Sequence, residues 1–184
     1  MKIPAPFALP DSGALKLNPL RQRLAALCLV AFAAIATTPI ARADALARGT
    51  AAYARGDYNR AARELEPLAQ RGNPRALALL GFLYENGFGE PQAYVAAANL
   101  YAQAAMQGDT FAQARLGLLH DKGYGVPQNF VLAYKWLNLA AAHTTGRQRD
   151  YYARLRDAVR SKMSNDEIDE GQRLAQYWAP VGPR

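Results

Sequence analysis

Residues able to carry out catalytic or metal chemistry are few in this chain. It has one cysteine, Cys28, and two histidines, His120 and His143. The histidines lie 23 residues apart and lack the i, i+4 spacing with which one helix places two imidazoles on a metal ion. A single cysteine excludes an intrachain disulfide and forms no zinc-binding pattern. We therefore expect no metal, no cofactor and no catalytic residue, with His120 half-buried in the core and His143 at a helix end.

The carboxylates and the glycine-rich segments indicate structural roles. The acidic groups Glu64/Glu66 and Asp166/Glu167/Asp169/Glu170 are expected on surface helix turns near caps, where they offset the helix dipole and favour solubility. The segments GFG at 87–89 and GYG at 123–125 lack the third glycine or the Lys-Ser/Thr pair of phosphate-binding loops. They predict turns between helices.

The N-terminal segment predicts export. A basic stretch precedes an apolar segment of 13 residues, Leu24–Ala36, which is shorter than the roughly 20 residues that span a membrane. Ala41 and Ala43 then place small residues before a cut at Asp44. We predict that residues 1–43 are a signal peptide and that the protein is periplasmic. The alternative is an uncleaved anchor in the inner membrane.

Removal of this segment changes what the charge implies. The whole chain of 184 residues is 51% hydrophobic and carries a net charge of +7, which predicts a folded protein with an anionic partner such as nucleic acid. Residues 44–184 hold 17 basic and 14 acidic residues, a net charge of +3. We therefore expect no nucleic-acid partner, and membrane contact only through an uncleaved signal segment.

An internal repeat of 36 residues organises the rest of the chain. Residues 73–108 and 109–144 align without a gap and are identical at 13 positions, including glycines, a proline and a glutamine. A period of this length is typical of helical solenoids. Residues 44–72 form a weaker copy, and residues 145–184 break the period. The predicted organisation is a first repeat at 44–72, repeats at 73–108 and 109–144, and a C-terminal cap at 145–184.

Each repeat predicts a helix, a turn and a second helix. Asn73 suits a helix N-cap, and Pro74 suits the first helical position. Gly87 and Gly89 end this helix, and a second one is expected over about 93–107. In the cap, a charged helix over about 147–162 precedes the capping box Ser164–Glu167, which begins a helix ending near Trp178. We predict an all-α protein of about eight helices.

The repeated motifs resemble a known family. LGFLYENGFGEPQ at 80–92 and LGLLHDKGYGVPQ at 116–128, each followed by paired alanines, are similar to the Sel1-like repeat, a 36-residue relative of the tetratricopeptide repeat (TPR). Gly56-Asp57-Tyr58 resembles a TPR turn. The resemblance covers about 45–145 and departs from the pattern at His120, Leu100 and Thr144. It implies an α-solenoid whose concave face, lined by first helices, binds a protein or peptide, often in the bacterial envelope.

Matching to the tetratricopeptide pattern also predicts which residues line that concave face. They are Arg55, Arg75, Phe82, Glu85, Asn86, Phe111, Leu118, Asp121 and Lys122. Apolar and charged side chains mixed in this way suit an extended peptide or a partner helix. The alternative is that Phe82, Phe111 and Leu118 only pack against neighbouring helices.

The expected function is that of an exported, non-catalytic adaptor or scaffold of the cell envelope. The partner is a protein or peptide whose identity the residues do not specify. The alternative function is an accessory protein or weak hydrolase acting on envelope polymers, which would need a nucleophile and a base in one cleft. The basic segment 147–162 is expected to present a solvated charged face, with an acidic partner or anionic lipid as the alternative. Its apolar side, formed by Tyr151, Tyr152, Leu155 and Val159, is expected to pack on the last repeat.

Overall fold

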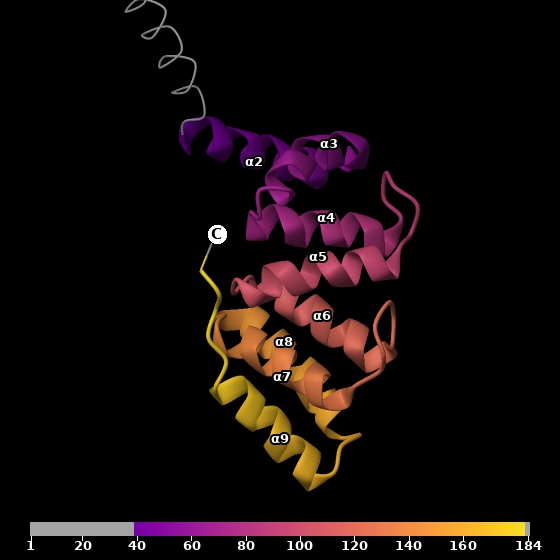
Figure 1. The fold of residues 1–184 in the computed structure, drawn as a ribbon, viewed down its shortest axis with the longest axis vertical. Coiled ribbons are helices and arrows are strands. Elements are labelled where there is room, and N and C mark those ends of the chain that lie inside the picture. Colours follow the sequence, from indigo (N-terminus) through magenta and orange to yellow (C-terminus); the bar gives the residue numbers. More distant parts are fainter. Residues whose placement is uncertain (1–38, 183–184) are drawn as a thin grey trace, which may run out of the picture. The chain divides into compact units, whose positions relative to one another are not determined.

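The computed structural model describes residues 39–182, with side chains from Asp44 onward, and this range contains eight α-helices and no strands (Figure 1). The helices are α2 (Pro39–Ala54), α3 (Tyr58–Ala69), α4 (Pro74–Asn86), α5 (Tyr94–Met106), α6 (Thr110–Lys122), α7 (Phe130–Ala142), α8 (Gly146–Arg160) and α9 (Asn165–Gln176). The all-α prediction is confirmed. Cys28 and the apolar segment Leu24–Ala36 lie outside the described residues.

Helices that follow one another in the chain pack side by side. From α3 to α8 each helix contacts the next, and α9 returns to pack on α7 (Figure 1). This is the arrangement of an α-solenoid, in which each helical hairpin covers the apolar face of its neighbour. Within the described residues, no helix has the length and apolar character needed to cross a membrane.

Local sequence sets most of the helix ends. The Asn73 side chain accepts a hydrogen bond from the Ala76 N–H, and Asp109 caps α6 in the same way. Gly87 ends α4 in the left-handed conformation, with φ of 68°, where a residue with a Cβ is strained. The capping box between Ser164 and Glu167 is present. These caps explain why the predicted starts of α4 and α9 match the structure.

Two predicted boundaries differ from the structure at their C-terminal ends. The charged helix ends at Arg160 instead of 162, because the chain turns after Ser161 to reach the cap of α9. The last helix ends at Gln176, and Trp178 lies beyond it. The Trp178 ring instead meets the edges of Trp136 and His143 at centroid distances of 6.2 and 6.1 Å.

Small residues let the helices of each repeat approach closely. A Cβ on Gly81 would lie 2.9 Å from the Tyr101 ring, and one on Gly117 would lie 2.8 Å from Leu137 Cγ. Fully buried alanines such as Ala97 and Ala104 line the same contacts. The alanine content of the chain therefore serves close helix packing.

The turn of each repeat packs on the start of the preceding second helix. Phe88 stacks on Tyr58 at 4.5 Å, and Tyr124 lies 4.8 Å from Tyr94. At Gly125, where φ is +69°, a Cβ would lie only 2.3 Å from the Tyr94 carbonyl. This contact between repeats requires glycine, which explains why the second glycine of each turn recurs.

The C-terminal tail lies along the second helices. The Val181 N–H donates to the Met106 carbonyl of α5 at 2.8 Å. Pro180 lies near Gly108, at the end of the same repeat. The tail runs back from α9 past the ends of earlier helices (Figure 1) and so extends the cap over the array.

Candidate partner-binding face

Three half-buried aromatic side chains from three first helices form a continuous row. Tyr53 of α2 contacts Phe82 of α4 with ring centroids 5.7 Å apart, and Phe82 contacts Phe111 of α6 at 6.0 Å. We call these three side chains the aromatic face. Two of them, Phe82 and Phe111, were predicted to line the concave face, and the structure brings them together.

Two arginines lie over the rings of the aromatic face. The Arg75 guanidinium is 5.7 Å from the Phe111 centroid, and the Arg115 guanidinium is 5.6 Å from that of Phe82. Such cation–π pairs hold a cation flat against an apolar surface. The Arg75 side chain remains 49% exposed, and its carboxylate neighbour Asp109 lies 4.0 Å away. Arg75 therefore keeps donor groups available on this face.

Glu85 stabilises the face from beneath. The carboxylate is buried, accepts a hydrogen bond from the Tyr101 hydroxyl at 2.7 Å and binds Arg115, whose Nε lies 2.9 Å away. Burial and the Glu85 charge raise the pKa of Tyr101 well above its ordinary value, so the phenol stays protonated and donates. Glu85 thus links α4, α5 and α6 instead of facing solvent.

Asp121 occupies the equivalent position one repeat later and is also buried. Its carboxylate binds Lys162 Nζ at 2.5 Å and lies 3.4 Å from Lys122 Nζ. Lys162 belongs to the turn after α8, so the contact ties the last repeat to the cap. Both predicted carboxylates of the concave face are therefore engaged by cations of the chain itself.

The other predicted positions lie around these groups. Arg55 and Lys122 are exposed, at the ends of α2 and α6. Asn86 is exposed, and its side-chain amide donates to the Phe82 carbonyl at 2.8 Å. Leu118 is half-buried and faces a hollow between α6 and α8.

This hollow, of about 290 Å³, extends the face toward the cap. Its lining residues are Phe111, Ala114, Arg115 and Leu118 of α6, and Gln148, Tyr151, Tyr152 and Leu155 of α8. Sequence reasoning placed the apolar side of α8 against the last repeat, which is correct for buried Tyr152 and Val159. It missed that Tyr151 stays 48% exposed and that α8 forms a wall of the hollow. Residues 148, 151, 152 and 155 have the spacing of one helix face, so the sequence could have indicated that they line a common surface.

Tyr152 belongs to the α8 wall of the hollow. The Tyr152 hydroxyl accepts a hydrogen bond from the Gln148 amide at 2.8 Å. Burial raises the pKa of Tyr152, and the charges of Asp109 and Arg75 act on it in opposite directions.

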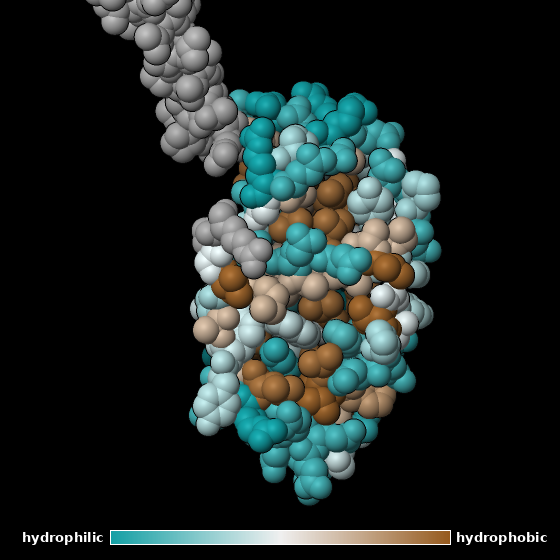
Figure 2. Space-filling model, in the orientation of Figure 1, coloured by the Kyte–Doolittle hydropathy of each residue, from teal (hydrophilic) through white to brown (hydrophobic). Residues whose placement is uncertain are grey.

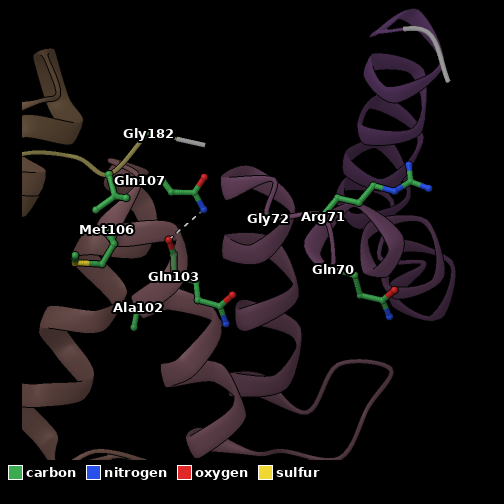
Figure 3. A pocket seen from close by; sticks show the side chains of 9 residues that line it. Gln70, Arg71, Gly72, Ala102, Gln103, Met106, Gln107 and Gly182 are labelled. Atoms are coloured by element: carbon green, nitrogen blue, oxygen red, sulfur yellow. Dashed lines mark hydrogen bonds between the residues drawn. The ribbon is translucent and has the colours of Figure 1, made fainter. Parts of the chain in front are cut away.

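Two other hollows lie among α3, α4 and α5. One, of about 660 Å³, lies between the end of α3, the second half of α5 and the C-terminal tail; Gln103 and Met106 line it, and Gln107 donates to the Gln103 carbonyl (Figure 3). The other, of about 350 Å³, includes Leu80 and Leu100. Hydrophobic surface is visible over α4 on the face shown in Figure 2. Sequence reasoning identified neither hollow.

The histidines have the structural positions expected of them. His120 is half-buried, with Nδ1 3.3 Å from the Pro127 carbonyl oxygen, and burial lowers the pKa of its imidazole. His143 follows α7, with Nδ1 2.9 Å from the Leu139 carbonyl oxygen. In the part of the chain that the structure describes, no group of three His, Cys, Asp or Glu residues is arranged to hold a metal ion.

Stacked helical hairpins define the class of α-solenoid repeat proteins. In this protein the aromatic face, Arg75 and the hollow beside Leu118 together form one surface on the first helices, which we call the first-helix face. The family model "Sel1 repeat" matches residues 74–109 and 110–144, so these two segments of the chain are Sel1 repeats. The matched segments each begin one residue after the repeats predicted from the sequence. No curated protein matches the chain.

Two solved structures are similar to this one. A protective antigen of uropathogenic Escherichia coli that displays an SLR fold is 21% identical, with a TM-score of 0.68, over 74% of this chain and 29% of the antigen. A Sel1 repeat protein from Oxalobacter formigenes is 29% identical, with a TM-score of 0.57, over 74% of this chain and 55% of that protein. The match thus spans under a third and just over half of their lengths. Sel1 repeat proteins are typically non-catalytic scaffolds for protein interactions.

Proposed function

We propose that this protein is a non-catalytic scaffold that binds a peptide or helix of another protein on its first-helix face. The observation that carries this proposal is the contact of Tyr53, Phe82 and Phe111, contributed by three different helices. A preformed apolar row needs no ordering when a partner binds, which lowers the entropic cost of association. Arg75, which keeps exposed donor groups, supplies hydrogen bonds that orient the partner.

The ion pairs beneath the face support the same proposal. Glu85 and Asp121 hold adjacent first helices in place through Arg115 and Lys162. A binding surface built on rigid helices presents its side chains in one geometry. We assign these carboxylates a positioning role and leave contact with the partner to Arg75, Phe82, Phe111 and Leu118.

We propose further that the protein is exported and acts in the cell envelope. The support is the sequence of residues 1–43, with its basic start, apolar stretch and small residues before Asp44. The cut would fall within α2, and the described residues from Asp44 onward include the Arg48–Glu64 pair that joins α2 to α3. Intact mass measurement of the protein recovered from a periplasmic fraction tests this proposal. A mass beginning at Asp44 supports it, and a mass that retains residues 1–43 contradicts cleavage.

Affinity capture from envelope fractions tests the binding face. We expect the wild-type protein to retain specific partners and the double variant Phe82→Ala/Phe111→Ala to lose them. Because both rings also pack against neighbours, circular dichroism must show that the variant is still folded. Val95→Ala, a truncation at a side chain that is 62% exposed on α5, is the matched control. Equal recovery by wild type and a folded double variant would contradict the proposal.

A further inference from the structure

The positive excess after residue 43 lies in one stretch of the sequence. Residues 109–162, which form α6, α7 and α8, hold nine Lys and Arg residues against four Asp and Glu. Residues 44–108 hold six of each, and residues 163–184 hold two basic and four acidic residues. The whole positive excess after residue 43 therefore lies in the stretch that contains α6 and α8, the two walls of the hollow, although Lys135 of α7 lines a separate hollow.

The lining of that hollow contains no carboxylate. Arg115 is its one charged lining residue, and the remaining positions are apolar or carry hydroxyl or amide groups. Tyr151, at the edge, is 48% exposed, and Leu155 and Leu118 supply apolar surface from opposite helices. Because Arg115 is already paired with Glu85, the hollow itself suits a large apolar side chain.

Arg75 places a cation with exposed hydrogen-bond donor groups beside the hollow. Its guanidinium lies over Phe111, which is itself a lining residue. Asp109 Oδ1 accepts from the Ala112 N–H as the cap of α6, and Oδ2 is 4.0 Å from Arg75 Nη1. This long ion pair leaves Arg75 free to form a shorter, bidentate pair with a carboxylate of a partner.

We propose that the partner segment is acidic, with an Asp or Glu side chain on Arg75 and a neighbouring Leu, Phe, Tyr or Trp side chain in the hollow between α6 and α8. This proposal rests on the proposed function and names the chemistry of the partner. It differs from a general affinity of α8 for anionic lipid, because a concave apolar hollow between two helices receives a single side chain, whereas a lipid surface contacts a protruding face.

Selection from an unbiased phage library of random dodecapeptides, with the full chain immobilised, tests the proposal. We expect enrichment of peptides that combine Asp or Glu with a large apolar residue. We expect the dissociation constant of an enriched synthetic peptide to rise at least about tenfold in Arg75→Gln and in Tyr151→Ala. The matched controls Arg63→Gln and Tyr177→Ala, on exposed side chains outside the hollow, should stay within about twofold of wild type.

Several outcomes would overturn the proposal. They are a library that yields no enriched peptides, enriched peptides that are neutral or basic, and binding that is equal in wild type and both hollow variants. A further outcome is that phosphatidylglycerol vesicles bind the chain and lose affinity in the same two variants, which would assign the surface to lipid. Affinity capture can still depend on Phe82 and Phe111 while the chain selects no acidic peptides. In that case the acidic partner is wrong and the scaffold function stands.

Discussion

Arg115 of α6 donates from Nε to the Glu85 carboxylate of α4 at 2.9 Å, a contact between residues 30 positions apart in the sequence. It connects the first helices of two successive repeats under the aromatic face. The Tyr101 hydroxyl of α5 binds the same carboxylate. Three helices therefore depend on one buried acid, and the geometry of the proposed binding face depends on it as well.

Replacing this acid should destabilise the array. Glu85→Ala leaves Arg115 and Tyr101 without their partner, and we expect the free energy of unfolding to fall by about 2–3 kcal/mol, somewhat less than for a fully buried pair because Arg115 is partly exposed. Urea denaturation measures the change. The matched control is Glu90→Ala, at an exposed glutamate in the turn, with an expected change within about 0.5 kcal/mol. Equal losses in the two variants would show that the Glu85 contacts do not stabilise the fold.

Alanine substitutions at two turn glycines distinguish the free energy lost through a steric clash from that lost through an unfavourable backbone conformation. At Gly125 an added Cβ collides with the Tyr94 carbonyl, and φ is +69°, so Gly125→Ala should cost about 3 kcal/mol or more. Gly56 has φ of +77° but no atom within 4 Å of its Cβ position. Gly56→Ala should therefore cost only about 1 kcal/mol. Similar denaturation midpoints for the two variants would argue against the close contact between repeats.

His120 gives the fold a specific pH dependence. Burial lowers the pKa of its imidazole in the folded protein, so the unfolded chain binds more protons between that lowered pKa and its ordinary value of about 6.5. The stabilisation is complete above about pH 6.5 and is lost as the pH falls toward the folded-state pKa. His120→Tyr, which introduces the residue of the equivalent position Tyr84, should remove this loss.

Urea denaturation at about pH 5 and about pH 8 measures the effect, since these values bracket the titration of histidine. The carboxylates titrate in both proteins, so their contribution cancels in the difference between wild type and His120→Tyr. We expect wild type to lose more stability than the variant on acidification. Parallel changes in the two proteins would show that His120 is not responsible.

Much of the fold was predictable because its determinants are local. Asn73, Gly87 and the Ser164–Glu167 pair mark helix ends through hydrogen bonds or backbone conformations that involve only nearby residues. The repeat then places successive hairpins side by side, since each copy buries the same positions. The all-α array and its cap follow from these two facts.

The candidate site was only partly predictable, because its contacts join distant residues. Glu85 and Asp121 occupy pattern positions expected on the concave face, but both carboxylates are buried in ion pairs. Their partners, Arg115 and Lys162, lie 30 and 41 residues further along the chain. The apolar spacing of α8 indicates that one face is covered. It does not specify that Tyr151 remains exposed beside Leu118, because that depends on how α8 crosses the last repeat.

The central claim is that a partner protein contacts the first-helix face. Site-specific photocrosslinking tests it most directly, with p-benzoylphenylalanine in place of Tyr151 in one protein and in place of Tyr177, which is 80% exposed after α9, in another. Both positions already carry exposed aromatic side chains, so each substitution replaces one aromatic ring with another. We predict a covalent adduct with a partner protein from position 151 and none from position 177. Adducts of equal yield from both positions, or from position 177 alone, would contradict the proposed binding face.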